Sequence, residues 1–152
     1  MKKLITSLAL LAACHSSSTT TTTSSPVVLR GSETGAADPM TAIRGFLTAA
    51  KQTDLQAMGA LWGNAQGAAR DQWPRDELEK REFVMMCYLK HDRYDILGDA
   101  PNPGGTRAVI VNLTLGSLTR STNFEVIRGA NNRWFVQNVD LKPLQDLCAR
   151  KG

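Results

Sequence analysis

The sequence predicts an α+β fold in which N-terminal helices pack on a curved antiparallel sheet of about four strands, with a short helix at the C-terminus. Between residues 38 and 89, apolar side chains recur at the three- and four-residue spacing of amphipathic helices. After Asp92 they alternate every second residue, as in strands joined by short turns. Helices that precede such a run of strands favour a helical layer on one face of the sheet.

Asp38 and Pro39 predict the start of the first helix, because aspartate is a preferred N-cap and proline suits the first helical position. This helix should end near Gln52. Thr53 then begins a second helix as its N-cap, with Gln56 at the capping-box position. The apolar residues of the two helices are Ile43, Phe46, Leu47, Ala50, Leu55, Met58, Leu61 and Trp62.

The third helix is predicted to begin near Arg75, after a polar loop that runs from Gly63 to Pro74. Its first half carries acid-to-base pairs one turn apart, which favour a solvated face. Its second half, residues 83–89, is almost continuously apolar, so we expect it to be largely buried. The two pairs are Asp76 with Lys80 and Glu77 with Arg81.

Four strands are predicted in the second half of the chain. The first surrounds Tyr94 and Ile96 and leads into a turn rich in glycine and proline at residues 98–105. The second, 109–115, and the third, near 124–126, alternate cleanly between apolar and polar residues.

The fourth strand, residues 133–141, follows a hairpin loop at 129–132. Apolar residues on both of its faces indicate a strand that is central or covered on both sides. Pro143 then opens a short terminal helix. The two faces are Trp134 and Val136 on one side, and Phe135, Val139 and Leu141 on the other.

The N-terminus has the pattern of a secretory signal peptide, with two lysines, a short apolar run and small residues before Cys14. The run is shorter than the roughly 20 residues that span a bilayer. The stretch Leu11-Ala12-Ala13-Cys14 resembles the lipobox of bacterial lipoproteins, in which the cysteine receives a diacylglycerol and the signal is cut before it. The alternative is an ordinary cleaved signal with an incidental cysteine.

This resemblance divides the chain into a signal peptide (1–13), a lipidated cysteine with a flexible tether rich in serine and threonine (14–37), and a single domain (38–152). It implies a lipid-anchored protein of the cell envelope that faces the periplasm or the exterior. His15 stands where many bacteria place a retention aspartate, so the outer membrane is the expected destination if the host has one.

The predicted domain also resembles a known fold. Leading helices, a long central hairpin and a last strand of the Arg-Trp-Phe-Val type, at 133–136, are similar to the nuclear-transport-factor-2-like cone fold over about residues 38–147. More narrowly, the domain is similar to small bacterial lipoproteins of unknown function with this fold. A cystatin-like domain with fewer helices is the main alternative.

The chain has three cysteines, and lipidation of Cys14 leaves Cys87 and Cys148. An even pair in an exported protein favours a disulfide, which we predict between the third helix and the terminal helical turn. The alternative is two buried free thiols that act as small apolar residues.

His91 is the candidate catalytic residue, because enzymes on the cone fold place ionisable side chains in its cavity. It lies near Asp92, Tyr94 and Asp95, and a histidine beside a carboxylate can act as a general acid or base. The same position lets a basic side chain complement a helix C-terminus. No metal-ligand cluster, phosphate loop or dinucleotide motif is present in the sequence, so we predict no metal and no cofactor.

Charge argues against nucleic acid as a partner, since the formal net charge of +4 falls to +2 without Lys2 and Lys3, and the remaining basic residues are scattered. The favoured function is a membrane-anchored lipoprotein with a non-enzymatic binding or scaffold domain, whose partner is a small apolar ligand or an envelope protein. The alternatives are a cavity enzyme of the hydratase or isomerase type that uses His91, and a homodimeric assembly module that uses the outer face of the sheet.

Overall fold

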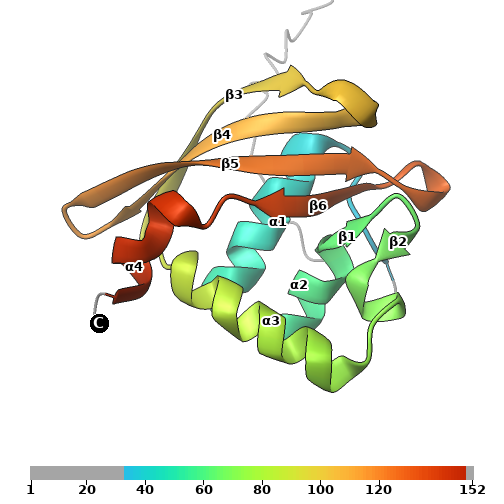
Figure 1. Cartoon of the computed structure of the whole chain (residues 1–152), viewed down its shortest axis with the longest axis horizontal. Helices are drawn as coiled ribbons and strands as arrows, with labels where there is room; N and C mark the ends of the chain where they lie inside the picture. The colour runs from blue at the N-terminus through green and yellow to red at the C-terminus, as the bar shows by residue number, and fades with distance from the viewer. Residues whose placement is uncertain (1–32, 150–152) are drawn as a thin grey trace, which may run out of the picture.

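The computed structural model of the chain describes residues 33–149 (Figure 1). The predicted signal peptide, Cys14 and most of the predicted tether lie outside these residues. The α+β fold is confirmed, because helices cover one face of a curved antiparallel sheet and a short helix ends the described chain (Figure 1). The helices are α1 (Pro39–Gln52), α2 (Leu55–Leu61), α3 (Arg75–Tyr88) and α4 (Gln145–Ala149).

The main sheet has the order β3-β4-β5-β6, and each strand is antiparallel to its neighbour. Its strands are β3 (Arg93–Pro101), β4 (Thr106–Leu115), β5 (Leu118–Arg128) and β6 (Trp134–Val139). A second, two-stranded sheet lies in the loop between α2 and α3. Its strands, β1 (Gly63–Asn64) and β2 (Gly67–Ala68), are too short to show an alternating pattern, and the sequence analysis did not predict them.

The core lies between α1 and the concave face of the sheet. The register places Val109 opposite Phe124 and Val111 opposite Thr122, so these side chains point toward the helices together. Core side chains therefore occupy the space in which a cone cavity was expected. Those with no exposed surface include Ile43, Phe46, Leu47, Met58, Val109, Val111, Leu113, Phe124, Val126 and Val136.

Helix α1 ends at Gln52 as predicted, but α2 begins one residue later than expected. The Asp38 side chain caps α1 as predicted and accepts a hydrogen bond from the Thr41 amide at 2.8 Å. Thr53 ends α1 in the left-handed conformation, with φ of 59°, and does not cap α2. The N-cap is Asp54, whose carboxylate accepts from the Ala57 amide at 3.0 Å, so the predicted capping box at Thr53 and Gln56 is wrong.

Helix α3 corrects a second prediction, because much of its apolar second half is exposed. Phe83 and Val84 are each 56% exposed. The helix lies at the outside of the helical layer and can bury only one stripe of its surface. The predicted surface pairs are confirmed, with Lys80 Nζ 3.8 Å from Asp76 and Arg81 Nη2 2.6 Å from Glu77. The buried stripe consists of Leu78, Glu82, Met85 and, just after the helix, Leu89.

Strand β6 lies at one edge of the sheet, and its two faces are both covered. Val136 pairs with Val126 and Val139 pairs with Phe124, so both valines face the helices. A β-bulge between these pairs adds one residue, and it overturns the prediction that the two valines lie on opposite faces. On the other face Phe135 is 1% exposed and lies close to the glycines of the neighbouring loops.

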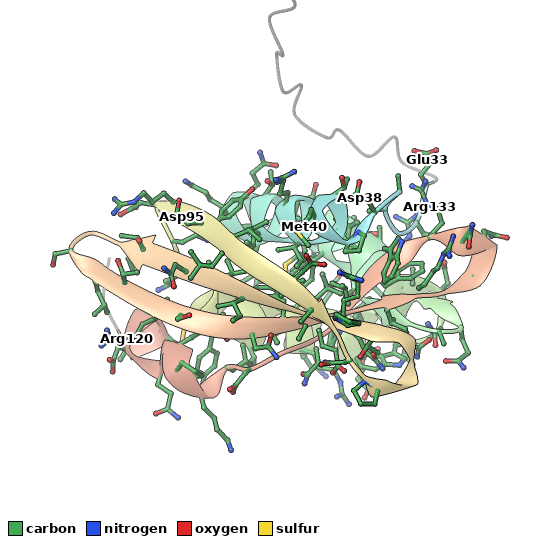
Figure 2. All side chains as sticks on the ribbon, turned by 90° about the horizontal axis from the view of Figure 1, so that it is seen from above. Glu33, Asp38, Met40, Asp95, Arg120 and Arg133 are labelled. Atoms are coloured by element: carbon green, nitrogen blue, oxygen red, sulfur yellow. A yellow bond between two sulfur atoms is a disulfide. The ribbon has the colours of Figure 1, made fainter. Side chains whose placement is uncertain are left out.

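The first described residues are already part of the domain. Ala36 pairs with Trp134 through two backbone hydrogen bonds of 2.8 Å. The Arg133 guanidinium donates to the carbonyl oxygens of Thr34 and Gly35, at 3.2 and 2.9 Å. Figure 2 shows this arginine beside Glu33, where the described chain begins. Residues 34–36, which the sequence analysis assigned to the tether, are thus held against β6.

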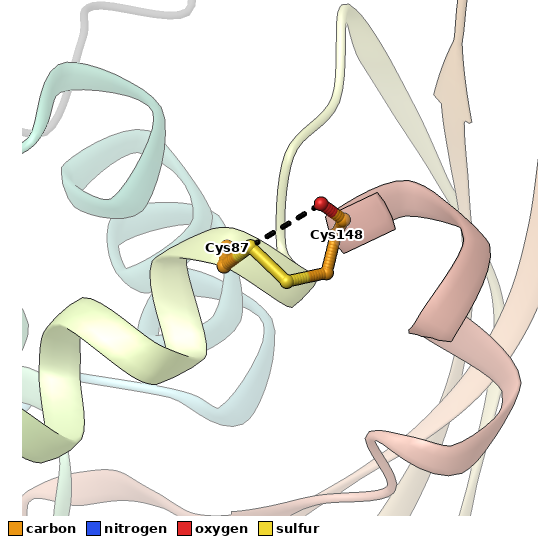
Figure 3. Close-up of a disulfide and its surroundings, with 2 residues drawn as sticks. All are labelled: Cys87 and Cys148. Atoms are coloured by element: carbon orange, nitrogen blue, oxygen red, sulfur yellow. Dashed lines mark hydrogen bonds between the residues drawn. A yellow bond between two sulfur atoms is a disulfide. The ribbon is translucent and has the colours of Figure 1, made fainter. Parts of the chain in front are cut away.

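A disulfide joins Cys87 of α3 to Cys148 of α4, with 4.7 Å between their Cα atoms (Figure 3). The predicted bridge is confirmed, and it pins the last helix to the helical layer. Leu144 and Leu147 beside it have no exposed surface. Within residues 33–149, no helix combines the length and the apolar character needed to cross a membrane.

Candidate binding grooves

An open groove of about 740 Å³ lies on the helical side of the domain, and we call it the α1–α3 groove. It runs between the C-terminal ends of these two helices and the turn that joins β4 to β5. The disulfide forms part of its wall through Cys87. The residues that line it are Ala50, Lys51, Thr53, Phe83, Met86, Cys87, Lys90, His91, Leu115 and Gly116.

This groove combines an apolar floor with a basic rim. Phe83 and Met86 line it from α3, and Leu115 lines it from β4. Lys51 and Lys90 lie at the rim, and no carboxylate is among the lining residues of the described chain. An apolar surface with cationic edges complements a molecule that carries an apolar body and an acidic head.

His91 forms one wall of the groove, and its side chain is buried, at 6% exposure. Its Nδ1 lies 2.7 Å from the Leu89 carbonyl oxygen, and because a carbonyl only accepts, Nδ1 carries the proton. Burial lowers the pKa of His91, and the nearby Lys51 ammonium lowers it further. The hydrogen bond with the Leu89 carbonyl and the charge of Asp92 act in the opposite direction, but the pKa remains below its ordinary value. The imidazole is therefore neutral at pH 7.

His91, Asp92 and Tyr94 line one hollow of about 340 Å³, but the carboxylates predicted to act with His91 make other contacts or face away. The Asp92 carboxylate accepts from the Gly116 amide at 2.6 Å, and the Asp92 carbonyl accepts from Lys51 Nζ at 2.5 Å. The Tyr94 ring meets the imidazole edge to face at 5.6 Å between centroids. Asp95 follows Tyr94 in β3 and so points to the opposite face of the sheet. In residues 33–149, no carboxylate hydrogen-bonds to His91.

A second open groove of about 430 Å³ lies between α3 and β6, and we call it the α3–β6 groove. Val84 and Met85 line it from the helix, and Val136 and Val139 line it from the strand. Phe83 and Val84 are thus neighbours with equal exposure that belong to different grooves. This arrangement provides a matched pair for mutagenesis.

The outer face of the sheet, which the alternative of a homodimeric module would use, is largely polar. Asp95, Asn112 and Ser121 lie side by side across β3, β4 and β5. Among the described residues, the large apolar side chains exposed on or beside this face are Ile110, at 48%, and Leu97 in the β3 bulge, at 59%. Such a face differs from the apolar centre of a stable homodimer interface.

Glu82 is a buried acid that the sequence analysis did not single out. Its side chain is 1% exposed, and its Oε1 atom accepts no hydrogen bond from the described residues. Burial raises the pKa of Glu82 to about 8, and the charges of Glu79 and Asp54 add to the effect. The sequence does carry a signal for this burial. Glu82 lies four residues after Leu78 and three before Met85, which places it on the apolar stripe of α3.

The grooves hold no constellation that binds a metal, since residues 33–149 contain no group of three or more histidine, cysteine, aspartate or glutamate side chains suited to an ion. Comparisons with protein-family models, with curated proteins and with solved structures found no match.

Proposed function

We propose that this chain is a lipid-anchored protein of the cell envelope whose domain binds an amphipathic anion in the α1–α3 groove without catalysing a reaction. The observation that carries the proposal is the groove itself, which joins apolar side chains to two lysines. The filled core leaves an open surface groove as the place for a ligand. No carboxylate of the described residues hydrogen-bonds to His91, and the Asp92 carboxylate already accepts from the Gly116 amide, which supports binding over acid–base catalysis.

The proposed ligand has an acyl chain and an acidic head. Its chain would lie against Phe83 and Met86, which α3 presents to the groove, and its head would meet the ammonium groups of Lys51 and Lys90. A protein anchored by its own acyl groups would work next to molecules of this class. Lys90 makes no hydrogen bond or ion pair with other described residues, so its charge is available to a ligand.

Cys14→Ala tests the anchor. Removing the thiol abolishes the acceptor of the diacylglycerol, so we expect an unprocessed precursor that incorporates no labelled fatty acid. Cys148→Ser, in which Cys14 is intact, is the control and should be labelled normally. A Cys14→Ala protein that is processed and labelled like the wild type would contradict the proposed anchor.

Phe83→Ala tests the groove. Full-length protein in nonionic detergent is exposed to a photoreactive dodecanoate, and the labelled residues are mapped by mass spectrometry. We expect labelling within the α1–α3 groove, with affinity about tenfold lower in Phe83→Ala, because burying a large apolar side chain contributes about 1.5–3 kcal/mol. Both the wild type and the variant should fold, since Phe83 is 56% exposed.

Val84→Ala is the matched control, because Val84 is equally exposed on the same helix but lines the α3–β6 groove. Labelling should be unchanged in this variant. A photoreactive dodecanol, which lacks the acidic head, should label the groove less than the acid does. Equal labelling of Phe83→Ala and Val84→Ala, or equal labelling by acid and alcohol, would contradict the proposal.

A further inference from the structure

A small pocket between α2 and α3, separate from both grooves, contains an unmatched acid. This α2–α3 pocket has a volume of about 180 Å³ and includes Glu82 in its wall. Two arginines also line it, and each already faces a carboxylate. Arg75 Nε is 2.6 Å from Glu79, and Arg70 Nε is 3.9 Å from Asp71. Glu82 is the third carboxyl group of the pocket, and no described residue forms an ion pair with it.

The surroundings of Glu82 favour a positive guest. The carboxylates of Glu79 and Asp54 act on it with the same sign of charge, so the site is more negative than Glu82 alone would make it. On the side of α2, Gly59 allows close approach, since a Cβ atom there would lie 3.0 Å from Glu82 Oε1. A buried carboxyl group without a donor is costly, and a cation that donates a hydrogen bond removes that cost.

We propose that the α2–α3 pocket binds a short alkylammonium group, with the ammonium donating to the Glu82 carboxylate and the aliphatic stem lying against Leu55 and Leu78. Both leucines line the pocket, and its volume suits a chain of a few carbons. The two arginine pairs keep the remaining charges balanced, so the guest completes a third pair. The source of the group is either a free amine or the lysine side chain of another protein.

Proton release distinguishes this site from nonspecific attraction. At pH 7 a carboxyl group with a pKa of about 8 is mostly protonated. The incoming ammonium keeps its own proton, so Glu82 must release one proton to solvent for each guest bound. Close to one proton should be released at pH 7 and little at pH 9, and apparent affinity should rise roughly tenfold between them. The other charged groups that face Glu82 are Asp54, Arg70, Asp71, Arg75 and Glu79.

The test is calorimetric titration of the full-length chain with butylammonium, repeated in buffers of different ionisation enthalpy to count protons. Glu82→Gln should weaken binding at least tenfold and abolish proton release. Glu77→Gln, on the exposed face of the same helix, should bind like the wild type. Acetyl-lysine methylamide is titrated in parallel, and the tighter of the two ligands identifies whether the pocket prefers a free amine or a protein side chain.

A second measurement does not depend on a variant. The Glu82 carboxyl carbon is followed by NMR against pH, and saturating butylammonium should lower its apparent pKa. An unchanged titration, binding that persists in Glu82→Gln, or equal binding of neutral butanol would each overturn the site. None of these outcomes bears on the dodecanoate experiment, which concerns a different surface of α3.

Discussion

Replacing both Cys87 and Cys148 by serine is expected to lower the free energy of unfolding by about 4 kcal/mol, because the bridge closes a loop of 61 residues in the unfolded chain. The bridge also holds α4, a helix of 5 residues that is too short to be stable alone. Urea denaturation at pH 7 measures the change. In the variant we further expect α4 to exchange its amide hydrogens faster than β4 does.

Reduction of the wild-type protein should reproduce the loss seen in the double serine variant. The same reductant should leave the double serine variant unchanged, which excludes an effect at another site. Leu144 and Leu147 are buried beside the bridge, and we expect them to stay packed after reduction. The free energy of unfolding should therefore fall only by the contribution of the disulfide itself. A wild-type midpoint that is insensitive to reduction would show that the bond is absent in the native protein.

Glu82→Gln is expected to change the pH dependence of stability. The pKa of Glu82 is raised from 4.5 in the unfolded chain to about 8 in the native protein. As pH rises between these values, the unfolded chain binds fewer protons than the native protein, and the free energy of unfolding falls. The variant lacks this loss. Its advantage over the wild type should therefore grow by roughly 4 kcal/mol between pH 5 and pH 9.

Paired denaturation series at several pH values measure this difference. The pKa of His91 is lowered in the native protein, so below about pH 6.5 the unfolded chain binds a proton more readily and the free energy of unfolding falls. This effect is the same in the wild type and in Glu82→Gln, so it cancels in the comparison. Glu77→Gln is the control for removing an exposed acid from the same helix. Parallel curves for the wild type and Glu82→Gln would show that Glu82 keeps an ordinary pKa in the native protein.

Features that depend on neighbouring residues were predicted well. The Asp38-Pro39 start of α1, the ion pairs of α3 and the alternation of β4 are local, since each depends on contacts within a few residues. Errors arose where two local signals competed. Thr53 and Asp54 are both acceptable caps, and the choice between them depends on the turn that ends α1. The β6 bulge has no signature in the sequence of that strand.

The grooves and the buried acid could not be predicted in the same way, because they depend on which elements pack together. Residues 83–89 are apolar throughout, but α3 lies at the outside of its layer, and Phe83 and Val84 stay exposed on either side of the buried stripe. Glu82 is buried because that stripe faces α2, where Gly59 leaves room for its carboxyl group. His91 lay in a promising sequence context, yet strand alternation directs Asp95 away from it.

The sequence by itself determined the α+β class and the order of the four helices and of the strands of the main sheet, because periodicity and capping are properties of the chain. It favoured Cys148 as the partner of Cys87 only together with the predicted lipidation of Cys14. Only the tertiary structure decided which of its apolar and charged side chains remain available to a ligand. The physical reason is that burial is a relation between elements distant in sequence. The α1–α3 groove brings Lys51, Phe83 and Leu115 together from a helix end, a second helix and a strand.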